Sequence, residues 1–201
     1  MVKRICVFCG SSPGALPEYT EAAEKLGNAL VKNGIGLVYG GARIGMMGAI
    51  ASAVMRANGE VIGVMPKGLV EKEVAFLGIT DLRVVNSMHE RKALMSELSD
   101  GFIALPGGLG TIEEILEVLT WSQLGIQKKP CGFLNVCHYY DKLIEFIDHA
   151  VEQEFINPES GKLILVDESP AALLKKFDDY RPPEVDKAAW ALQLAGRYLK
   201  T

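Results

Sequence analysis

The stretch from residue 102 to residue 115 reads FIALPGGLGTIEEI, and it predicts a strand, a tight turn and a helix in succession. The apolar run Phe102–Leu105 is typical of a buried strand, because parallel strands covered on both faces carry uninterrupted apolar residues. Pro106 and three glycines follow it, and helical periodicity then extends over Thr111–Leu124. A strand that passes through a glycine turn into a helix is the repeating unit of α/β proteins.

The same alternation of strands and helices extends from this stretch in both directions. Short apolar runs predict strands at Ile5–Cys9, Leu37–Tyr39, Val61–Met65, Leu82–Val85, Gly132–Val136 and Leu163–Val166. Helical periodicity predicts helices at Pro17–Asn33, Gly45–Ala57, Met88–Leu98, Tyr140–Gln153 and Pro170–Phe177, and Lys67–Gly78 is predicted to be a loop with some helix. The pattern predicts an α/β fold with a doubly wound, Rossmann-like parallel sheet and helices on both faces.

The chain is predicted to hold a single domain and a short appendage. Residues 1–181 carry the alternating pattern, and Arg181-Pro182-Pro183 interrupts it, because proline does not continue a helix. Residues 182–201 are predicted to be a helical extension. Its helix, Val185–Leu199, is expected to pack on the body of the protein or on a partner.

Length and composition exclude several classes of protein. A chain of 201 residues, 49% of them hydrophobic, can bury a core without disulfides or structural metal, and it is not a disordered chain. Its net charge of −4 contrasts with the basic face typical of nucleic-acid-binding domains. Its apolar runs are shorter than the roughly 18–20 residues that span a bilayer, and its first residues lack the pattern of a signal peptide. We therefore expect a cytoplasmic protein with no nucleic-acid or membrane partner.

The cysteines and histidines give no convincing metal or redox motif. Cys6 and Cys9 have the spacing of a redox or zinc pair, but residues three apart on a strand face opposite sides. We therefore expect all four cysteines to be reduced structural thiols. His89 and His138 are isolated, and a solitary histidine is poor support for a metal site.

Three predicted strands are followed by glycine-rich turns, Gly10–Gly14, Gly40–Gly48 and Pro106–Thr111. Ligands of doubly wound folds bind at the carboxyl ends of the strands, where these turns lie. Glycine lets backbone N–H groups approach an anion, and the helix that follows adds a partial positive charge. The turns match neither G-x-G-x-x-G nor the Walker pattern, so they indicate a phosphate-bearing ligand but neither NAD binding nor ATP hydrolysis. The alternative is that the glycines serve only the tight turns.

The predicted helix at Met88 begins with an unusual cluster of charges. Ser87 and Glu90 match a capping box, which is a structural explanation for both. Arg91 and Lys92 are cations early in a helix, where they oppose its dipole. Either they face an anion or a carboxylate, or they are an ordinary solvated pair.

Glu114 has two explanations of its own. Thr111 and Glu114 also match a capping box, so Glu114 could serve only to cap its helix. Alternatively, Glu114 is a catalytic carboxylate, because a negative charge beside a glycine-lined anion site is unfavourable unless the reaction requires it. The residues alone leave these alternatives open.

Four separate motifs resemble one protein family. Residues 106–114, PGGLGTIEE, are similar to the PGGxGTxxE signature of the LOG family of cytokinin-activating phosphoribohydrolases, some members of which are labelled lysine decarboxylases. MHERKA at 88–93 resembles the second motif of that family, and CGSS at 9–12 and TWSQLG at 120–125 resemble two more. The resemblance extends from about Lys3 to about Phe177. In the glycine stretch after Tyr39, Ala42 and Met46 replace the family's usual Gly and Leu.

This resemblance implies hydrolysis of the N-glycosidic bond of a nucleoside 5′-monophosphate, which releases a base such as an N6-prenylated adenine and ribose 5-phosphate. Breaking that bond builds oxocarbenium character on the ribose, which a carboxylate stabilises. Arg91 and Glu114 match the family's catalytic positions. The implied substrate-binding residues are Ser11, Gly41, Gly45, Glu73, Lys92, Gly107, Gly108, Gly110 and Thr111. A homodimer with the site close to the subunit interface is also implied, with no metal or organic cofactor.

Three functions are alternatives to the hydrolysis of cytokinin nucleotides. A carrier of nucleotide or molybdenum cofactor would share the fold and the glycine turns, but binding alone does not require the pair Arg91 and Glu114. Amino-acid decarboxylation normally needs a lysine-bound PLP on a much larger scaffold, and no lysine here has that setting. Unmodified AMP as the main substrate is not distinguished from cytokinin nucleotides by the motifs.

Overall fold

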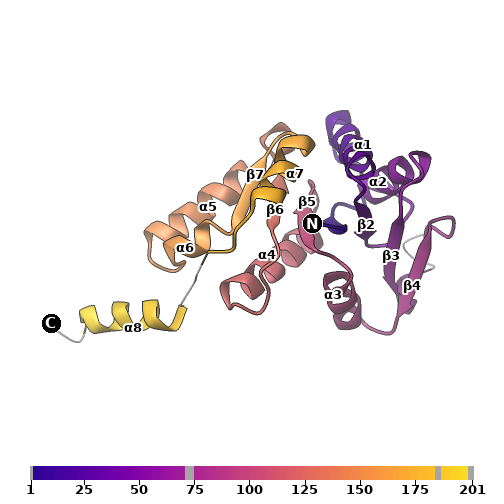
Figure 1. Ribbon diagram of the computed structural model, residues 1–201. Helices are drawn as coiled ribbons and strands as arrows, with labels where there is room; N and C mark the ends of the chain where they lie inside the picture. Colours follow the sequence, from indigo (N-terminus) through magenta and orange to yellow (C-terminus); the bar gives the residue numbers. More distant parts are fainter. Residues whose placement is uncertain (1, 71–74, 184–186, 199–201) are drawn as a thin grey trace.

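The computed structural model describes residues 2–70, 75–183 and 187–198. In this part of the chain seven parallel strands form one sheet in the order β4-β3-β2-β1-β5-β6-β7 (Figure 1). They are β1 (Arg4–Phe8), β2 (Gly36–Tyr39), β3 (Val61–Pro66), β4 (Asp81–Val85), β5 (Gly101–Ala104), β6 (Cys131–Leu134) and β7 (Ile164–Asp167). β2, β3, β5 and β6 are buried at every position, which explains their uninterrupted apolar sequences. The predicted fold class is confirmed.

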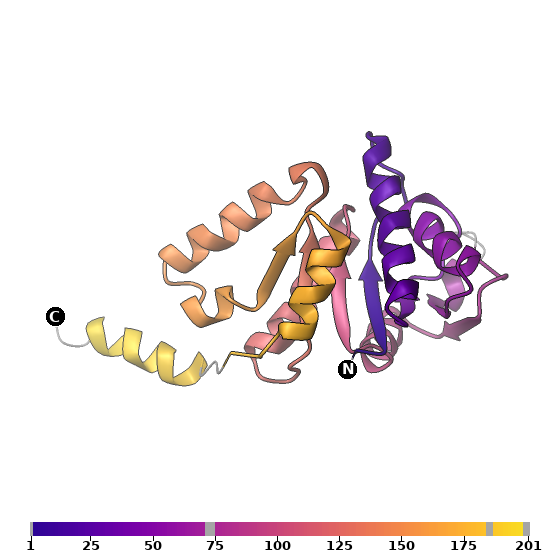
Figure 2. The same ribbon diagram turned by 45° about the horizontal axis from the view of Figure 1, so that its top comes forward.

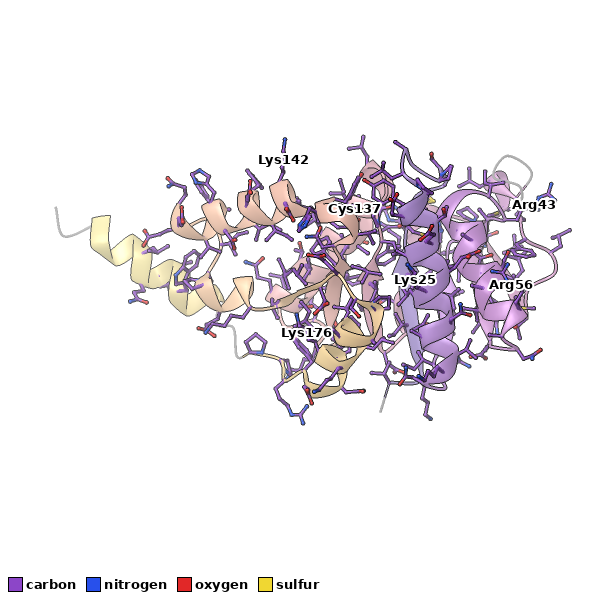
Figure 3. All side chains as sticks on the ribbon, turned by 90° about the horizontal axis from the view of Figure 1, so that it is seen from above. Lys25, Arg43, Arg56, Cys137, Lys142 and Lys176 are labelled. Carbon is purple, nitrogen blue, oxygen red and sulfur yellow. The ribbon has the colours of Figure 1, made fainter. Side chains whose placement is uncertain are left out.

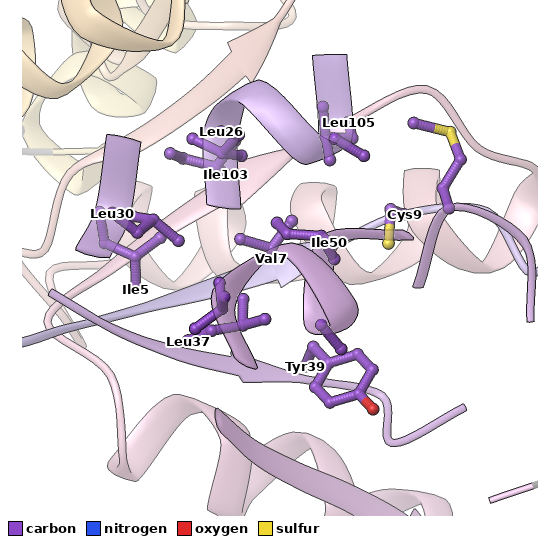
Figure 4. Close-up of a cluster of buried hydrophobic side chains, with 14 of the residues drawn as sticks. Ile5, Val7, Cys9, Leu26, Leu30, Leu37, Tyr39, Ile50, Ile103 and Leu105 are labelled. Atoms are coloured by element: carbon purple, nitrogen blue, oxygen red, sulfur yellow. The ribbon is translucent and has the colours of Figure 1, made fainter. Parts of the chain in front are cut away.

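Helices cover both faces of the sheet (Figure 2). One face packs against α1 (Pro17–Lys32), α2 (Gly45–Arg56) and α7 (Pro170–Asp179). The other face packs against α3 (Met88–Glu97), α4 (Leu109–Gln123) and α5 (Asp141–Glu152). The core of the first face joins Ile5 and Leu37 of the strands to Leu26, Leu30 and Ile50 of the helices (Figure 4). Two layers of helix therefore bury the inner strands of the sheet, and a site can form at the ends of these strands.

The direction of the chain reverses next to β1. From β1 it moves outward to β4, and it then returns through α3 to β5, which pairs with the other side of β1. In this register Ile5 lies beside Gly101, and Phe8 lies beside Ala104. The loops after β1 and β5 lead to helices on opposite faces of the sheet, so a crevice forms between them.

Most predicted elements agree with the structure, with boundaries that differ by at most two residues. The predicted loop at Lys67–Gly78 contains the short 3₁₀ helix η1 (Lys67–Leu69), as expected. Two short elements were not predicted, α6 (Pro158–Gly161) and the 3₁₀ turn η2 (Val136–His138). They hold too few residues to show a helical period.

The cysteines are free, as expected. Cys6 belongs to the core on the α3 and α4 side, and Cys9 belongs to the core on the α1 and α2 side, so the two do face opposite ways. Cys131 is buried as well, whereas Cys137 is exposed (Figure 3). No cluster of three or more metal-ligating side chains occurs among the described residues.

The last helix, α8 (Lys187–Tyr198), stands apart from both helical layers (Figures 1 and 2). The helix expected in the C-terminal extension is present, and its packing on a partner stays a prediction. In the portion of the chain that the structure covers, no helix is long and apolar enough to cross a membrane.

Candidate active site

The glycine turns after β1 and β5 meet at the crevice. The backbone N–H of Gly10 donates to the carbonyl of Pro106 at 3.1 Å, which joins the two turns. A Cβ atom on Gly107 would lie 2.8 Å from the Gly10 nitrogen and would also collide with the Thr111 hydroxyl. The turns approach this closely because neither Gly10 nor Gly107 has a side chain.

The N-terminus of helix α4 lies at this crevice. Its N-cap is Gly108, and its first helical residue is Leu109. Among the described residues, the backbone N–H groups of Gly108, Leu109, Gly110 and Thr111 have no hydrogen-bond acceptor. Four free donors at the positive end of a 15-residue helix are suited to an anion.

The predicted capping box at Thr111 is wrong. Because the helix begins two residues before Thr111, this residue lies inside the first turn, and Gly108 provides no side-chain cap. Glu114 is therefore not a capping residue. The other predicted cap is confirmed for Ser87, whose hydroxyl accepts a hydrogen bond from the Glu90 N–H at 3.1 Å, whereas the Glu90 carboxylate accepts from the N–H of Asn86 and not from that of Ser87.

Arg91 of α3 and Glu114 of α4 form an ion pair close to the N-terminus of α4. Arg91 Nη1 lies 3.6 Å from Glu114 Oε1, and the exposed fractions of the two side chains are only 10% and 11%. The Arg91 Nε donates to the carbonyl of Val64 in β3 at 3.1 Å, which anchors the guanidinium to the sheet. The cation early in α3 thus has a carboxylate opposite it, so the alternative of a solvated cation is excluded for Arg91.

Gly40 provides the space in which Arg91 lies. A Cβ atom on Gly40 would collide with Arg91 Nη2 and would lie 2.9 Å from Met47 Sδ. The guanidinium therefore rests against the bare backbone at the end of β2. A side chain at this position would force the guanidinium to move.

Burial makes Glu114 a weaker acid than an exposed glutamate. Desolvation raises its pKa from 4.5 to about 7, and this effect exceeds the opposing attraction of the Arg91 charge. Lys92 also favours the carboxylate form, whereas Glu113 and Glu117 disfavour it. Glu114 can consequently exchange a proton near neutral pH, as a general acid or base must.

A cavity of about 380 Å³ lies over the pair. Arg91, Glu114, the opening of α4 and the turn after β1 line it, together with Met47, Leu69, Met88 and Met95. A second cavity of about 310 Å³ adjoins it, and the two share Gly10, Ser11 and Gly108. Tyr19 and Tyr139 line the second cavity. One crevice thus combines an anion site, an ion pair and apolar walls, as small-molecule sites do.

Most of the residues predicted to bind substrate lie at this crevice. Ser11, Gly107, Gly108, Gly110 and Thr111 line one or both cavities. Gly45 has a positive φ of 58° and lets the start of α2 contact the backbone of Ser11, so it supports the turn.

Two predicted residues are placed elsewhere, and a third is not described. Gly41 accepts a hydrogen bond from the Phe76 N–H at 2.9 Å and does not line either cavity. Lys92 lines neither cavity, and its Nζ contacts Glu113 at 2.7 Å and Glu117 at 3.0 Å on α4. Glu73 lies outside the described residues.

Sequence reasoning missed two residues that shape the crevice. Gly40 is the first glycine of a turn that was singled out, but no local pattern shows that it faces Arg91. Tyr139 follows β6 and was not considered, although its hydroxyl donates to the carbonyl of Gly107 at 2.6 Å. Only the three-dimensional contact reveals both.

Comparisons with known proteins show to which family the chain is similar. A family model described as "Possible lysine decarboxylase" matches residues 47–177. The cytokinin riboside 5′-monophosphate phosphoribohydrolase LOG1 of Arabidopsis thaliana is 49% identical over 197 residues, which cover 96% of this chain and 92% of that protein. The probable cytokinin riboside 5′-monophosphate phosphoribohydrolase LOGL5 of Oryza sativa subsp. japonica is 49% identical over 190 residues, 94% of this chain and 77% of that protein.

A likeness among solved structures concerns the fold alone. The molybdenum cofactor carrier protein of Chlamydomonas reinhardtii has a TM-score of 0.66 over 90% of this chain and 100% of its own, but only 19% identity. Proteins with one fold often differ in function, so this match does not indicate a carrier. The sequence comparisons, with identity near one half over almost the whole chain, are decisive: the chain belongs to the LOG family.

Proposed function

We propose that this protein is a phosphoribohydrolase that cleaves the N-glycosidic bond of cytokinin riboside 5′-monophosphates. The products are the free base and ribose 5-phosphate. The observation that carries the proposal is the buried pair of Arg91 and Glu114 beside the four free N–H groups of α4, because it unites a reactive carboxylate with an anion site in one cavity.

The free N–H groups would hold the 5′-phosphate. Gly108, Leu109 and Gly110 present their backbone at the start of α4, and the helix dipole favours a doubly charged group there. Thr111 adds a hydroxyl on the same turn. With the phosphate fixed at this point, the ribose lies within reach of the carboxylate of Glu114, less than two helical turns further along α4.

Glu114 would then act on the anomeric carbon. As the bond between C1′ and the base nitrogen breaks, its electron pair leaves with the base, and positive charge develops on the ribose. The Glu114 carboxylate stabilises this charge and removes a proton from the water that attacks C1′. The base takes up one proton, so that one water molecule is consumed in each turnover.

Arg91 would orient Glu114 and keep it ionised. Its Nε is fixed on the carbonyl of Val64, so its charge stays near the carboxylate throughout the reaction. A carrier protein would gain nothing from this arrangement, since a buried ion pair costs desolvation free energy and does not itself bind the ligand.

The test is an assay of the purified protein with N6-isopentenyl-AMP and AMP in parallel, with detection of the free base and ribose 5-phosphate. We expect both products in equal amounts and a higher kcat/KM for the N6-substituted nucleotide. A higher kcat/KM for AMP would make AMP the main substrate. Nucleotide binding without release of base would instead favour a carrier.

We also infer a homodimer whose interface lies beside the crevice. Leu109, which is 87% exposed, and Met88, which is 42% exposed, place apolar side chains at the mouth of the cavity, where a second subunit would cover them. The cytoplasm is the proposed compartment, because three buried free thiols suit a reducing environment. Size-exclusion chromatography with light scattering tests the dimer.

A further inference from the structure

Two tyrosine hydroxyls donate hydrogen bonds to backbone carbonyls at the glycine turn after β5 and just before it. Tyr139 donates to the carbonyl of Gly107, and Tyr140 donates to the carbonyl of Leu105, each at 2.6 Å. Both tyrosines come from the segment after β6, which is remote in sequence from the turn. Tyr140 is buried, whereas Tyr139 is 42% exposed and lines the second cavity.

The bond from Tyr139 determines where an N–H group of the anion site points. In a trans peptide the carbonyl and the N–H lie in one plane and point in opposite directions. The carbonyl of Gly107 and the N–H of Gly108 belong to the same peptide. When the hydroxyl of Tyr139 fixes that carbonyl, it also directs the Gly108 N–H away from the tyrosine. Between two glycines this peptide would otherwise rotate freely.

The surroundings of Tyr139 make it a stable anchor. Its ring packs edge-on against Tyr140 at a centroid distance of 5.0 Å and against Tyr19 at 5.7 Å. The backbone N–H of Tyr140 donates to the side chain of the buried Asn135 at 2.8 Å, which ties the segment to the end of β6. The tyrosine hydroxyl is therefore held at its place before a ligand arrives.

We propose that Tyr139 is a positioning residue that orients the Gly107–Gly108 peptide to receive the 5′-phosphate. Its hydroxyl thereby supports the preference for a nucleoside 5′-monophosphate over the nucleoside. This inference rests on the proposed function, which places the phosphate at the opening of α4. The inference adds Tyr139 to the phosphate site. Tyr139 does not touch the phosphate, and it affects phosphate binding by fixing the carbonyl of Gly107.

Tyr139→Phe tests the proposal because it removes only the hydroxyl and keeps the ring packing. We expect the Kd for ribose 5-phosphate, measured by calorimetry, and the KM for AMP each to rise about fivefold to tenfold, the worth of one hydrogen bond. The kcat should fall much less. The Kd for adenosine, which has no phosphate, should stay unchanged.

Tyr180→Phe is the matched control. Tyr180 follows the last turn of α7, where Phe177 packs against Gly101 at the amino end of β5, whereas the crevice lies at the carboxyl ends of the strands. The Tyr180 hydroxyl has no hydrogen-bond partner among the described residues. This variant should bind both ligands like the parent protein.

Three results would overturn the proposal: no change in ribose 5-phosphate affinity on loss of the hydroxyl, an equal loss of affinity for adenosine, or no binding of ribose 5-phosphate by the parent protein. If the parent protein binds ribose 5-phosphate but releases no base from any nucleotide, the proposed hydrolysis fails. The role of Tyr139 is then still decided by the ribose 5-phosphate titration.

Discussion

Arg91 Nη1 lies 3.6 Å from Glu114 Oε1, although the two residues come from different helices and both side chains are nine-tenths buried. The pair forms at the point where α3 and α4 approach the carboxyl ends of β2, β3 and β5. Taking two charges out of water costs several kcal/mol, so a buried pair of this kind is weak support for a role in stability. The proposed function assigns the pair to the reaction, and its properties can be tested one residue at a time.

Glu114→Gln should abolish turnover and leave the fold intact. Gln has nearly the same shape, and Glu114 does not cap α4, so no backbone bond is lost. Loss of a group that acts as general base typically lowers the rate by about 10²–10⁴. The assay measures base release, with circular dichroism as the check on folding. A near-native rate would remove Glu114 from the mechanism.

The same variant should be more stable than the parent protein, but only at higher pH. Burial raises the pKa of Glu114 to about 7 from 4.5, so ionisation of this group costs the folded state free energy that the unfolded chain does not pay. Below pH 4.5 both states hold the proton, and the two proteins should have equal free energies of unfolding. The difference should grow between pH 4.5 and 7 and then stay constant. Urea unfolding at several pH values measures it, and equal stability at pH 8 would contradict the raised pKa.

The kcat/KM of the parent protein should rise with pH and level off above a midpoint of about 7. The ionised carboxylate is the form that stabilises the oxocarbenium ion, and it predominates only above the pKa of Glu114. A rate that falls with rising pH through this range would instead indicate that the protonated form is active. The measurement is the pH profile of kcat/KM with a subsaturating nucleotide.

Removal of the Arg91 charge should move this midpoint upward. The guanidinium favours the carboxylate form of Glu114, so without it the pKa of Glu114 should rise above 7. Arg91→Lys, which keeps a charge, should shift the profile less than Arg91→Ala. Arg56→Ala is the control, because Arg56 pairs with Glu24 on the surface of the other helical layer (Figure 3). An unchanged midpoint in Arg91→Ala would separate Arg91 from the ionisation of Glu114.

The sequence predicted the sheet well because its inner strands are buried on both faces and therefore appear as plain apolar runs. The start of α4 was misjudged at Thr111, because the free backbone of Gly108 allows the helix to begin earlier without a side-chain cap. The family motifs pointed to Arg91 and Glu114, but no local pattern shows that they pair. Contacts such as Tyr139 on Gly107 join segments remote in sequence, and periodicity carries no information about them.

Gly40→Ala tests whether the space under Arg91 is essential. The added Cβ would collide with Arg91 Nη2 and would lie 2.9 Å from Met47 Sδ, so we expect the guanidinium to shift and its bond to the Val64 carbonyl to weaken. We expect a rate loss comparable to that of Arg91→Ala and a destabilisation of about 1–3 kcal/mol, as for other overpacked sites. Gly68→Ala is the matched control, since a Cβ at Gly68 meets nothing within 4 Å.

If Gly40→Ala retains full activity while its stability falls, the guanidinium tolerates displacement, and the distance between Arg91 and Glu114 does not govern the rate. If activity falls and the pH midpoint rises as in Arg91→Ala, the bare backbone at the end of β2 is part of what keeps Glu114 ionised.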